Sequence, residues 1–240
     1  MRNKLTVGLL LFIPAMAFAD PNTWSLPDAD EWPEALRLFA LMTLLGLTPA
    51  LLIMLSSFTR IIVVLSILRT ALGLQQTPPN MVLMSLALFL TCMTMMPVAN
   101  RIYTESFIPW EAHQISTETA LLHAQKPIRA FLLRQTREKD VRQMAFLAKA
   151  PLPKRAEDVQ FHYLVPAFLL SELQTAFQIG FMIFLPFLLV DLVVSGILMT
   201  MGMMMVPPMS IALPIKLLLF VLIDGWSLVV QSLVGSFHGV

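Results

Sequence analysis

Cysteine and charge are both scarce in this 240-residue chain, whose single cysteine is Cys92. One cysteine excludes a disulfide framework and a paired-thiol redox centre, and Cys92 lies in an apolar run where we expect it to pack as a small hydrophobic residue. Lys, Arg, Asp and Glu make up 13% of the chain, against about a quarter in soluble domains. With a formal net charge of +1, the chain lacks the basic patch typical of a nucleic-acid partner.

Catalytic and metal-binding motifs are also missing. The sequence contains neither H-E-x-x-H nor G-x-S-x-G, and neither a Walker loop nor C-x-x-C. The histidines have no metal-ligand spacing to one another; they are His113, His123, His162 and His238. Asp191 and Asp224 could form the carboxylate pair of an intramembrane hydrolase, but no motif surrounds either. We predict a protein that is not an enzyme, with no cofactor and no metal.

Apolar sequence is what the chain has in abundance. Hydrophobic residues make up 57% of it, and the mean hydropathy is +0.76, which indicates a membrane protein. Two apolar blocks, residues 34–97 and 164–240, flank residues 98–163, which carry more than half of the charged residues. We predict an all-α membrane protein built of kinked helical hairpins, with a small helical domain between the two blocks.

The first 19 residues have the pattern of a secretory signal peptide. A positive n-region precedes a short apolar h-region, and Ala17-Phe18-Ala19 provides a small-x-small cleavage site. A retained first helix is the alternative, although the apolar stretch is short for a span and Pro14 interrupts it. Residues 20–33 would then form a short polar lead outside the cytoplasm. A cleaved signal peptide indicates a protein of the bacterial envelope.

The first apolar block is too long for one membrane span. Its sequence from Glu34 to Gly73 is nearly unbroken, with soft breaks expected at Gly46 and Pro49. A turn follows at residues 75–79.

Beyond that turn, residues 80–96 predict another apolar helix, closed by Pro97.

Residues 98–163 predict a small soluble helical domain. Ser116 or Thr117 would cap a helix that runs to Gln125, and Pro127 suits the first turn of the next helix. Apolar residues recur at helical spacing from Ile128 to Ala145, as thin stripes that need neighbours to pack against. Two crossings from an external N-terminus place this domain in the periplasm. The positive-inside rule favours the cytoplasm, but it weakens for long loops.

Charges inside the apolar blocks need partners, because an unpaired charge in hydrocarbon costs about 2.5–3.5 kcal/mol. Arg60 and Arg69, in the first block, either reach a headgroup region or face a polar interior or another subunit. Lys216 is the one cation of the second block, and we predict that it pairs with Glu172, within the chain or between neighbouring copies. The five prolines of that block predict bent or broken helices.

Residues 199–208, the methionine loop, join two long apolar runs. Six of the eleven residues from Met199 to Met209 are methionine. Pro207 and Pro208 end a helix that arrives from the N-terminal side. Thioether side chains are unbranched and polarisable, so they fill irregular gaps and adapt to varied surfaces. The loop is therefore either membrane-buried filler or a deformable seal around something that passes.

Several long segments carry a resemblance to a known family. They are Pro49–Leu52 through Ser57–Ile61, Leu72–Asn80, Pro166–Phe168 through Ser171–Leu173, Ala176–Phe181, Pro186-Phe187 to Asp191, and Met201–Met205 with Pro207-Pro208. On these residues the chain resembles the FliP family, the flagellar members of the type III secretion export-gate proteins, along almost its whole length.

The resemblance implies a pore-forming subunit of the flagellar type III protein export gate in the bacterial inner membrane, at the flagellar basal body. Several copies would form a ring around a central pore that passes unfolded flagellar proteins. The implied partners are the small membrane subunits FliQ and FliR, the export-apparatus proteins FlhA and FlhB, and the basal-body MS ring. A small-molecule transporter, which usually contains an internal repeat that we do not find, and a non-conducting scaffold of a secretion complex are the alternatives.

The resemblance also implies roles for individual residues. It assigns Glu172 and Lys216 to an intersubunit salt bridge and Asp191 to an acidic position important for export. It assigns a pore gasket to Met201, Met203, Met204 and Met205. Because the family assembly holds much of its apolar surface above the bilayer plane, protein neighbours would cover part of these helices in place of lipid.

Overall fold

A computed structural model describes residues 34–149, 159–203 and 205–238. Every element in these ranges is a helix, which confirms the all-α prediction for this part of the chain. The predicted signal peptide and the lead at residues 20–33 lie outside the described residues. The chain divides into a first unit that ends at Leu51 and a second that begins at Leu52.

The first unit contributes most of one apolar helix, α2 (Glu34–Met54). This helix is continuous through Gly46 and Pro49, where we expected soft breaks. The break between the first two helices falls later, at residues 55–57. A glycine lowers helix propensity by only about 1 kcal/mol, which the rest of an apolar helix can offset.

The second unit begins with α3 (Phe58–Ala71) and α4 (Asn80–Ile102), which are joined by the predicted turn. Helix α4 continues through a π-helix, η2 (Tyr103–Phe107), into α5 (Ile108–Glu111). The prediction that Pro97 closes this helix is wrong, because Pro97 lies inside α4. A proline removes one backbone hydrogen bond and leaves the bonds of the adjacent turns in place.

The polar segment forms α6 (Thr117–Gln135) and α7 (Glu138–Leu147). The capping prediction is confirmed, since the Ser116 hydroxyl accepts a hydrogen bond of 3.2 Å from the Thr119 backbone N–H. We expected Pro127 to begin a new helix. This prediction is wrong, because Pro127 lies buried inside α6.

The predicted apolar stripes are confirmed as well: Leu132, Val141 and Ala145 are buried against the N-terminal part of the following long helix.

Three helices form the second apolar block: α8 (Phe161–Thr200), α9 (Pro208–Leu222) and α10 (Gly225–His238). Helix α8 is a single element of 40 residues that continues through Pro166 and Pro186. We expected these prolines to bend or break a helix, but they do not break α8. The sharp bend of the block lies between α9 and α10, which meet at 66°. It falls at Asp224, whose φ of 50° is left-handed.

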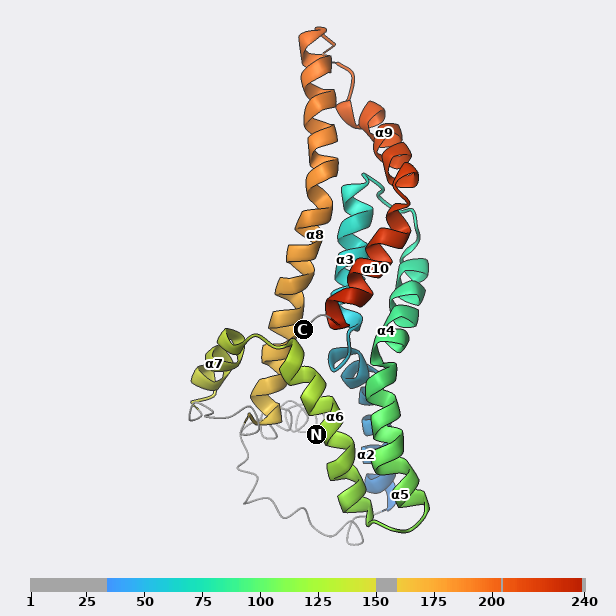
Figure 1. The fold of residues 1–240 in the computed structure, drawn as a ribbon, viewed down its shortest axis with the longest axis vertical. Helices are drawn as coiled ribbons and strands as arrows, with labels where there is room; N and C mark the ends of the chain where they lie inside the picture. The colour runs from blue at the N-terminus through green and yellow to red at the C-terminus, as the bar shows by residue number, and fades with distance from the viewer. Residues whose placement is uncertain (1–33, 150–158, 204, 239–240) are drawn as a thin grey trace, which may run out of the picture. The chain divides into compact units, whose positions relative to one another are not determined.

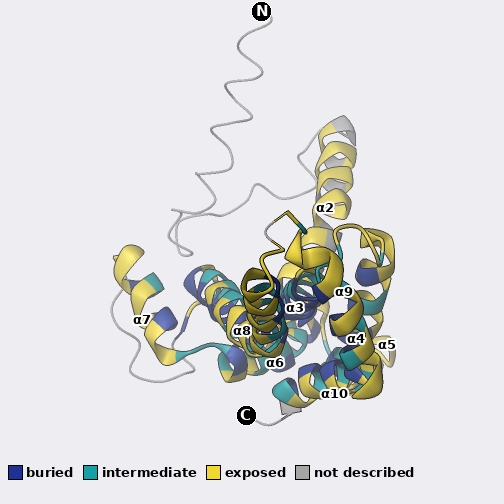
Figure 2. Cartoon of the chain, turned by 90° about the horizontal axis from the view of Figure 1, so that it is seen from above, coloured by how far each residue is buried: buried dark blue, intermediate teal, exposed yellow. Residues whose placement is uncertain are grey.

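Helix α3 lies at the centre of the second unit, beside α4, α8 and α10 (Figure 1). Four of its apolar side chains have no exposed surface: Ile61, Val64, Leu65 and Leu68. Buried residues gather around α3, whereas α9 is exposed over most of its surface (Figure 2). The core therefore covers the part of the hairpin of α8 and α9 that is far from the loop between them, and leaves the end of the hairpin at that loop exposed.

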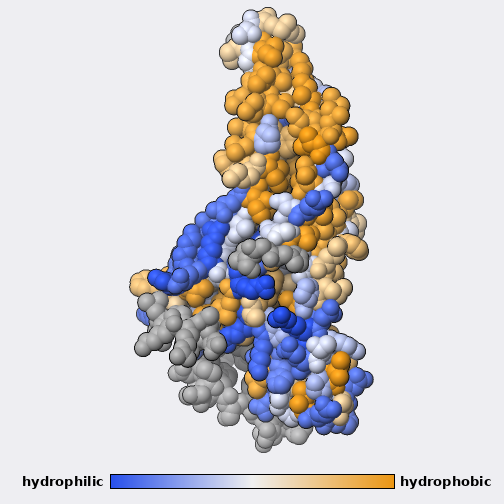
Figure 3. All heavy atoms as spheres, in the orientation of Figure 1, coloured by the Kyte–Doolittle hydropathy of each residue, from blue (hydrophilic) through white to orange (hydrophobic). Residues whose placement is uncertain are grey.

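Among the described residues, two helical stretches are long and apolar enough to cross a membrane, Asn80–Glu111 and Phe161–Thr200. Helices α9 and α10 together could form a third, bent span. Apolar residues cover the C-terminal half of α8 and α9, whereas hydrophilic residues gather around α6 and α7 (Figure 3). This separation matches the predicted order of apolar and polar segments.

Gly180 lies where α8 packs closely against Ile67 of α3. It is buried, and a Cβ at this position would lie 3.2 Å from the Cβ of Ile67. We expect Gly180→Ala to lower the free energy of unfolding by about 1–3 kcal/mol, because the added methyl group forces two packed helices apart. Denaturant unfolding in detergent measures this change.

Gly196, in the same helix, is the matched control, because a Cβ there would meet nothing within 4 Å. Gly196→Ala should leave the stability unchanged or raise it by up to about 1 kcal/mol, since alanine favours the helix. Equal losses from both substitutions would contradict the close approach.

Candidate functional site

A polar cluster in the core is centred on Arg60 of α3, which is only 2% exposed. Its guanidinium forms a bidentate ion pair with Glu172 of α8, in which Nε donates to Oε2 at 2.9 Å and Nη2 donates to Oε1. Glu172 has no exposed surface. Nη2 also donates to Oε1 of Gln135, on α6, at 2.9 Å. Two-pronged pairing of this kind fixes both side chains in one geometry.

The same guanidinium holds the last helix of the chain. Nη1 of Arg60 donates to the hydroxyl of Ser236 at 3.1 Å and to its backbone carbonyl at 3.3 Å. The ring of Phe237 lies over the guanidinium, with 4.0 Å between the ring centroid and Cζ. Arg60 therefore faces a polar interior, not a headgroup region, and connects α3, α6, α8 and α10. We call Arg60, Gln135, Glu172 and Ser236 the Arg60 cluster.

Polar residues of α8 near Glu172 form hydrogen bonds with the segment that connects α6 to α7 and with the start of α7. The Ser171 hydroxyl donates to Oδ2 of Asp140 at 2.6 Å and accepts a bond of 3.0 Å from the Arg137 backbone N–H. The Arg137 side chain donates to Thr175 at 3.2 Å and to Gln178 at 2.7 Å. These bonds fasten the polar segment to one side of α8, which is therefore covered by protein.

A second ion pair lies nearer the C-terminal end of α8, which leads into the methionine loop. Lys216 of α9 is 5% exposed, and its Nζ donates to Oδ2 of Asp191 at 2.6 Å. Nζ also donates to the backbone carbonyl of Ala71, at the C-terminal end of α3, at 3.1 Å. A cation is favoured there because the carbonyl groups at a helix C-terminus carry partial negative charge. Lys216 thus ties the α8–α9 hairpin to α3.

Glu172 and Lys216 do not pair with each other within the chain, contrary to the first form of our prediction. Glu172 bonds Arg60, and Lys216 bonds Asp191. The reason is distance along α8: 19 residues at 1.5 Å each place Glu172 about 28 Å from the level of Asp191. A bridge between Glu172 and Lys216 of neighbouring copies stays a prediction.

Arg69 has a local role at the end of α3. Its Nη1 donates to Oδ1 of Asn80 at 2.5 Å and to the carbonyl of Pro78 at 3.3 Å. The side chain therefore holds the turn that leads into α4 and takes no part in either ion pair.

The methionine loop forms the tip of the α8–α9 hairpin (Figure 1). Gly202 has a left-handed φ of 72°, and the Met203 backbone N–H donates to the Leu198 carbonyl at 3.0 Å, which closes the end of α8. Met201, Met203 and Met205 are 66%, 42% and 98% exposed. Met204 lies outside the described residues.

Little packing lies directly beneath the methionine loop. Val194, Leu198 and Ala212 form a small buried cluster there, with Val190 packed against it. The tip of the hairpin is therefore held by four small or medium apolar side chains and, further down, by the Lys216–Asp191 pair.

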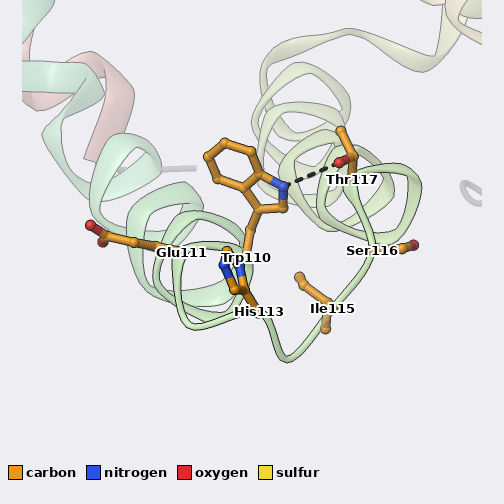
Figure 4. Close-up of a pocket in the computed structure, with 6 residues that line it drawn as sticks. All are labelled: Trp110, Glu111, His113, Ile115, Ser116 and Thr117. Carbon is orange, nitrogen blue, oxygen red and sulfur yellow. Dashed lines mark hydrogen bonds between the residues drawn. The ribbon is translucent and has the colours of Figure 1, made fainter.

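A shallow pocket lies between α5 and the start of α6 (Figure 4). Trp110 forms one wall, and its Nε1 donates to Oγ1 of Thr117 at 3.2 Å. Glu111, His113 and Ser116 also line the pocket, and no hydrogen bond joins them to one another as a catalytic pair would require. Within the described ranges, no three His, Cys, Asp or Glu side chains gather as a metal site would need.

Comparison with known proteins decides the family. The FliP family model matches residues 41–233 of the chain. The chain belongs to the FliP family. It is 49% identical to the flagellar biosynthetic protein FliP of Pectobacterium carotovorum subsp. carotovorum over 240 residues, which cover 99% of this chain and 93% of that protein.

Relatives from distant bacteria are similar to a comparable degree. The flagellar biosynthetic protein FliP of Bacillus subtilis is 47% identical over 216 residues, 90% of this chain and 98% of that protein. That of Agrobacterium fabrum is 42% identical over 246 residues, 99% of this chain and 100% of that protein. The family resemblance drawn from the sequence is confirmed.

The matched region contains both ion pairs and the whole methionine loop. Sequence reasoning singled out Arg60, Glu172, Asp191 and Lys216, but it missed Gln135 and Ser236, the other members of the Arg60 cluster. Neither has a sequence signal of its own, because a single glutamine or serine on a helix is ordinary.

Proposed function

We propose that the protein is a pore-forming subunit of the flagellar type III protein export gate in the bacterial inner membrane. Several copies would form a ring, and unfolded flagellar proteins would pass through its centre. Membership of the FliP family, the flagellar role in the names of its relatives, and the apolar helices support this proposal. Residues 98–163 would lie in the periplasm, and the methionine loops of the copies would meet on the axis.

The observation that carries the proposal is the exposed methionine loop at the tip of a weakly packed hairpin. Met205 is 98% exposed between two long apolar helices. The Met205 side chain makes almost no contact within its own chain, so it is suited to contact other chains. Thioethers form no strong hydrogen bonds, so a passing polypeptide can displace them at low cost and they can close again behind it.

Exposed apolar side chains along α8 support the assembly of several copies. Phe177, Phe181, Leu189 and Leu192 are each at least 60% exposed, and only 17% of the most apolar stretch of α8 is buried. A single chain cannot cover this surface, so lipid or other protein must. We propose further copies, FliQ and FliR as the direct neighbours, with FlhA, FlhB and the MS ring completing the export apparatus.

A photo-crosslinking amino acid in place of Met205, in cells that hold a stalled export substrate, tests this function. We expect a covalent adduct between the protein and the substrate polypeptide, because position 205 would line the pore. Met182 is the matched control, since it is 69% exposed but lies on the apolar part of α8. A small-molecule transporter or a scaffold predicts no polypeptide adduct at position 205, and that result would contradict the export gate.

A further inference from the structure

We propose that the thioethers of Met201, Met203 and Met205 are a site of reversible oxidation by peroxides to methionine sulfoxide, and that oxidation weakens the seal. The first half stands on the exposure and chemistry of the methionine loop alone. The second half rests on the proposed function, because it needs a seal to weaken.

Exposure makes these sulfur atoms accessible. Met205 is 98% exposed and Met201 is 66% exposed, and the buried cluster of Val194, Leu198 and Ala212 beneath the loop is small. Both methionines lie in the connection after α8 and not on a helix face. In a single chain, water and small polar oxidants can therefore reach both side chains from several directions.

Other methionines of similar exposure lie in a different environment. Met182 is 69% exposed and Met81 is 80% exposed, but both lie on the candidate membrane-spanning helices α8 and α4. Lipid or neighbouring protein covers such positions in a membrane, and a polar peroxide enters hydrocarbon poorly. The methionine loop thus holds highly exposed methionines that lie beyond the end of the candidate span Phe161–Thr200.

The chemistry is an oxygen-atom transfer with hydrogen peroxide as the oxidant. A lone pair of the thioether sulfur attacks one peroxide oxygen, the O–O bond breaks as the S–O bond forms, and the transferred oxygen's proton moves to the departing oxygen, which leaves as water. Sulfur is oxidised by two electrons and the peroxide is reduced. Methionine sulfoxide reductase reverses the change, with thiol electrons and release of water.

Oxidation changes what the loop can exclude. A thioether accepts hydrogen bonds only weakly, whereas a sulfoxide is polar and binds water. Sulfoxides from several copies at one constriction would draw water into it. A barrier that depends on apolar, deformable contacts would then become a hydrated opening that passes ions.

Peptide mass spectrometry of the membrane-reconstituted full chain, sampled during exposure to hydrogen peroxide, tests the first half. We expect sulfoxide to form at Met205 and Met201 several-fold faster than at Met182. Met182 is the matched control for Met201, because the exposed fractions of their side chains in the chain, 69% and 66%, are nearly equal. Equal rates at all three positions, or faster oxidation of Met182, would overturn the proposal and leave the proposed function standing.

Ion leak through the reconstituted export gate tests the second half. Peroxide should raise the leak several-fold, and methionine sulfoxide reductase should restore it. A variant with leucine at positions 201, 203, 204 and 205 keeps the loop apolar and removes its sulfur atoms, so its leak should not respond to peroxide. Selective oxidation of the loop without any change in leak would overturn the effect on the seal and would also count against the proposed function.

Discussion

Replacing Arg60 by alanine is expected to lower the free energy of unfolding by about 3–5 kcal/mol, the cost of breaking a buried ion pair from one side. The carboxylate of Glu172 would stay in the core with no cation beside it, because Glu172 has no exposed surface. Gln135 and Ser236 would lose their bonds to the guanidinium as well. Denaturant unfolding of the purified protein in detergent measures the loss.

Two further variants separate this effect from a general loss of charge. Arg142→Ala breaks the exposed Arg142–Glu138 pair, whose side chains are 64% and 80% exposed respectively, and should change stability by less than about 1 kcal/mol. The double variant Arg60→Met with Glu172→Leu removes both buried charges and should recover most of the loss, because apolar replacements of buried pairs are often neutral. A double variant as unstable as Arg60→Ala alone would contradict this account.

The Lys216–Asp191 pair predicts an unequal response to the removal of its two partners. Lys216 is buried, whereas the Asp191 side chain is 39% exposed. Asp191→Leu should cost about 3 kcal/mol, because the ammonium group would keep only the Ala71 carbonyl as a partner. Lys216→Met should cost only about 1 kcal/mol, because water can reach Asp191 and methionine fills much of the space of the lysine.

Amide hydrogen exchange along α9 measures this difference. Helix α9 depends on the Lys216–Asp191 pair and on the small cluster beneath the methionine loop, so Asp191→Leu should speed exchange in α9 and leave α3 protected. Lys216→Met should have a much smaller effect. Equally fast exchange in α9 of both variants would contradict the claim that the buried Lys216 depends on Asp191 more than Asp191 depends on Lys216.

Proline positions were the least reliable guide to this fold. Pro97, Pro127, Pro166 and Pro186 all lie inside helices that continue past them. Each proline costs one backbone hydrogen bond, while tertiary packing and an apolar environment favour keeping the remaining bonds of the helix. The bend between α9 and α10 falls instead at Asp224, which forms an Asp-Gly pair with Gly225, a turn signal that our sequence analysis did not use. Proline positions alone therefore could not locate the bends.

The two ion pairs differ in how far a sequence could predict them. Asp191 lies nine residues before the end of α8, and Lys216 lies eight residues after the start of α9. In an antiparallel hairpin these nearly equal distances bring the two side chains together, so counting outwards from the methionine loop would have predicted this pair. No such rule connects Arg60 with Glu172, because their contact depends on the packing of helices that are not consecutive.

Composition was sufficient for the helical membrane class, and the order of apolar and polar segments was sufficient for the positions of most helices. The proposed function did not follow from either. The long matching segments, among them Leu72–Asn80 and Met201–Met205, indicated the export role. Within that role the exposed methionine loop supports a seal, although an exposed thioether loop alone fits both filler and seal.

The most direct test of the seal is the ion leak of bacteria that carry alanine at Met203, Met204 and Met205. We expect a large rise in leak while flagellar proteins are still exported, because alanine is too short to close the pore. Alanine at Met81, Met84 and Met93, which are exposed on α4, should leave the leak unchanged. An unchanged leak in the loop variant, or an equal rise in the α4 variant, would contradict the methionine gasket.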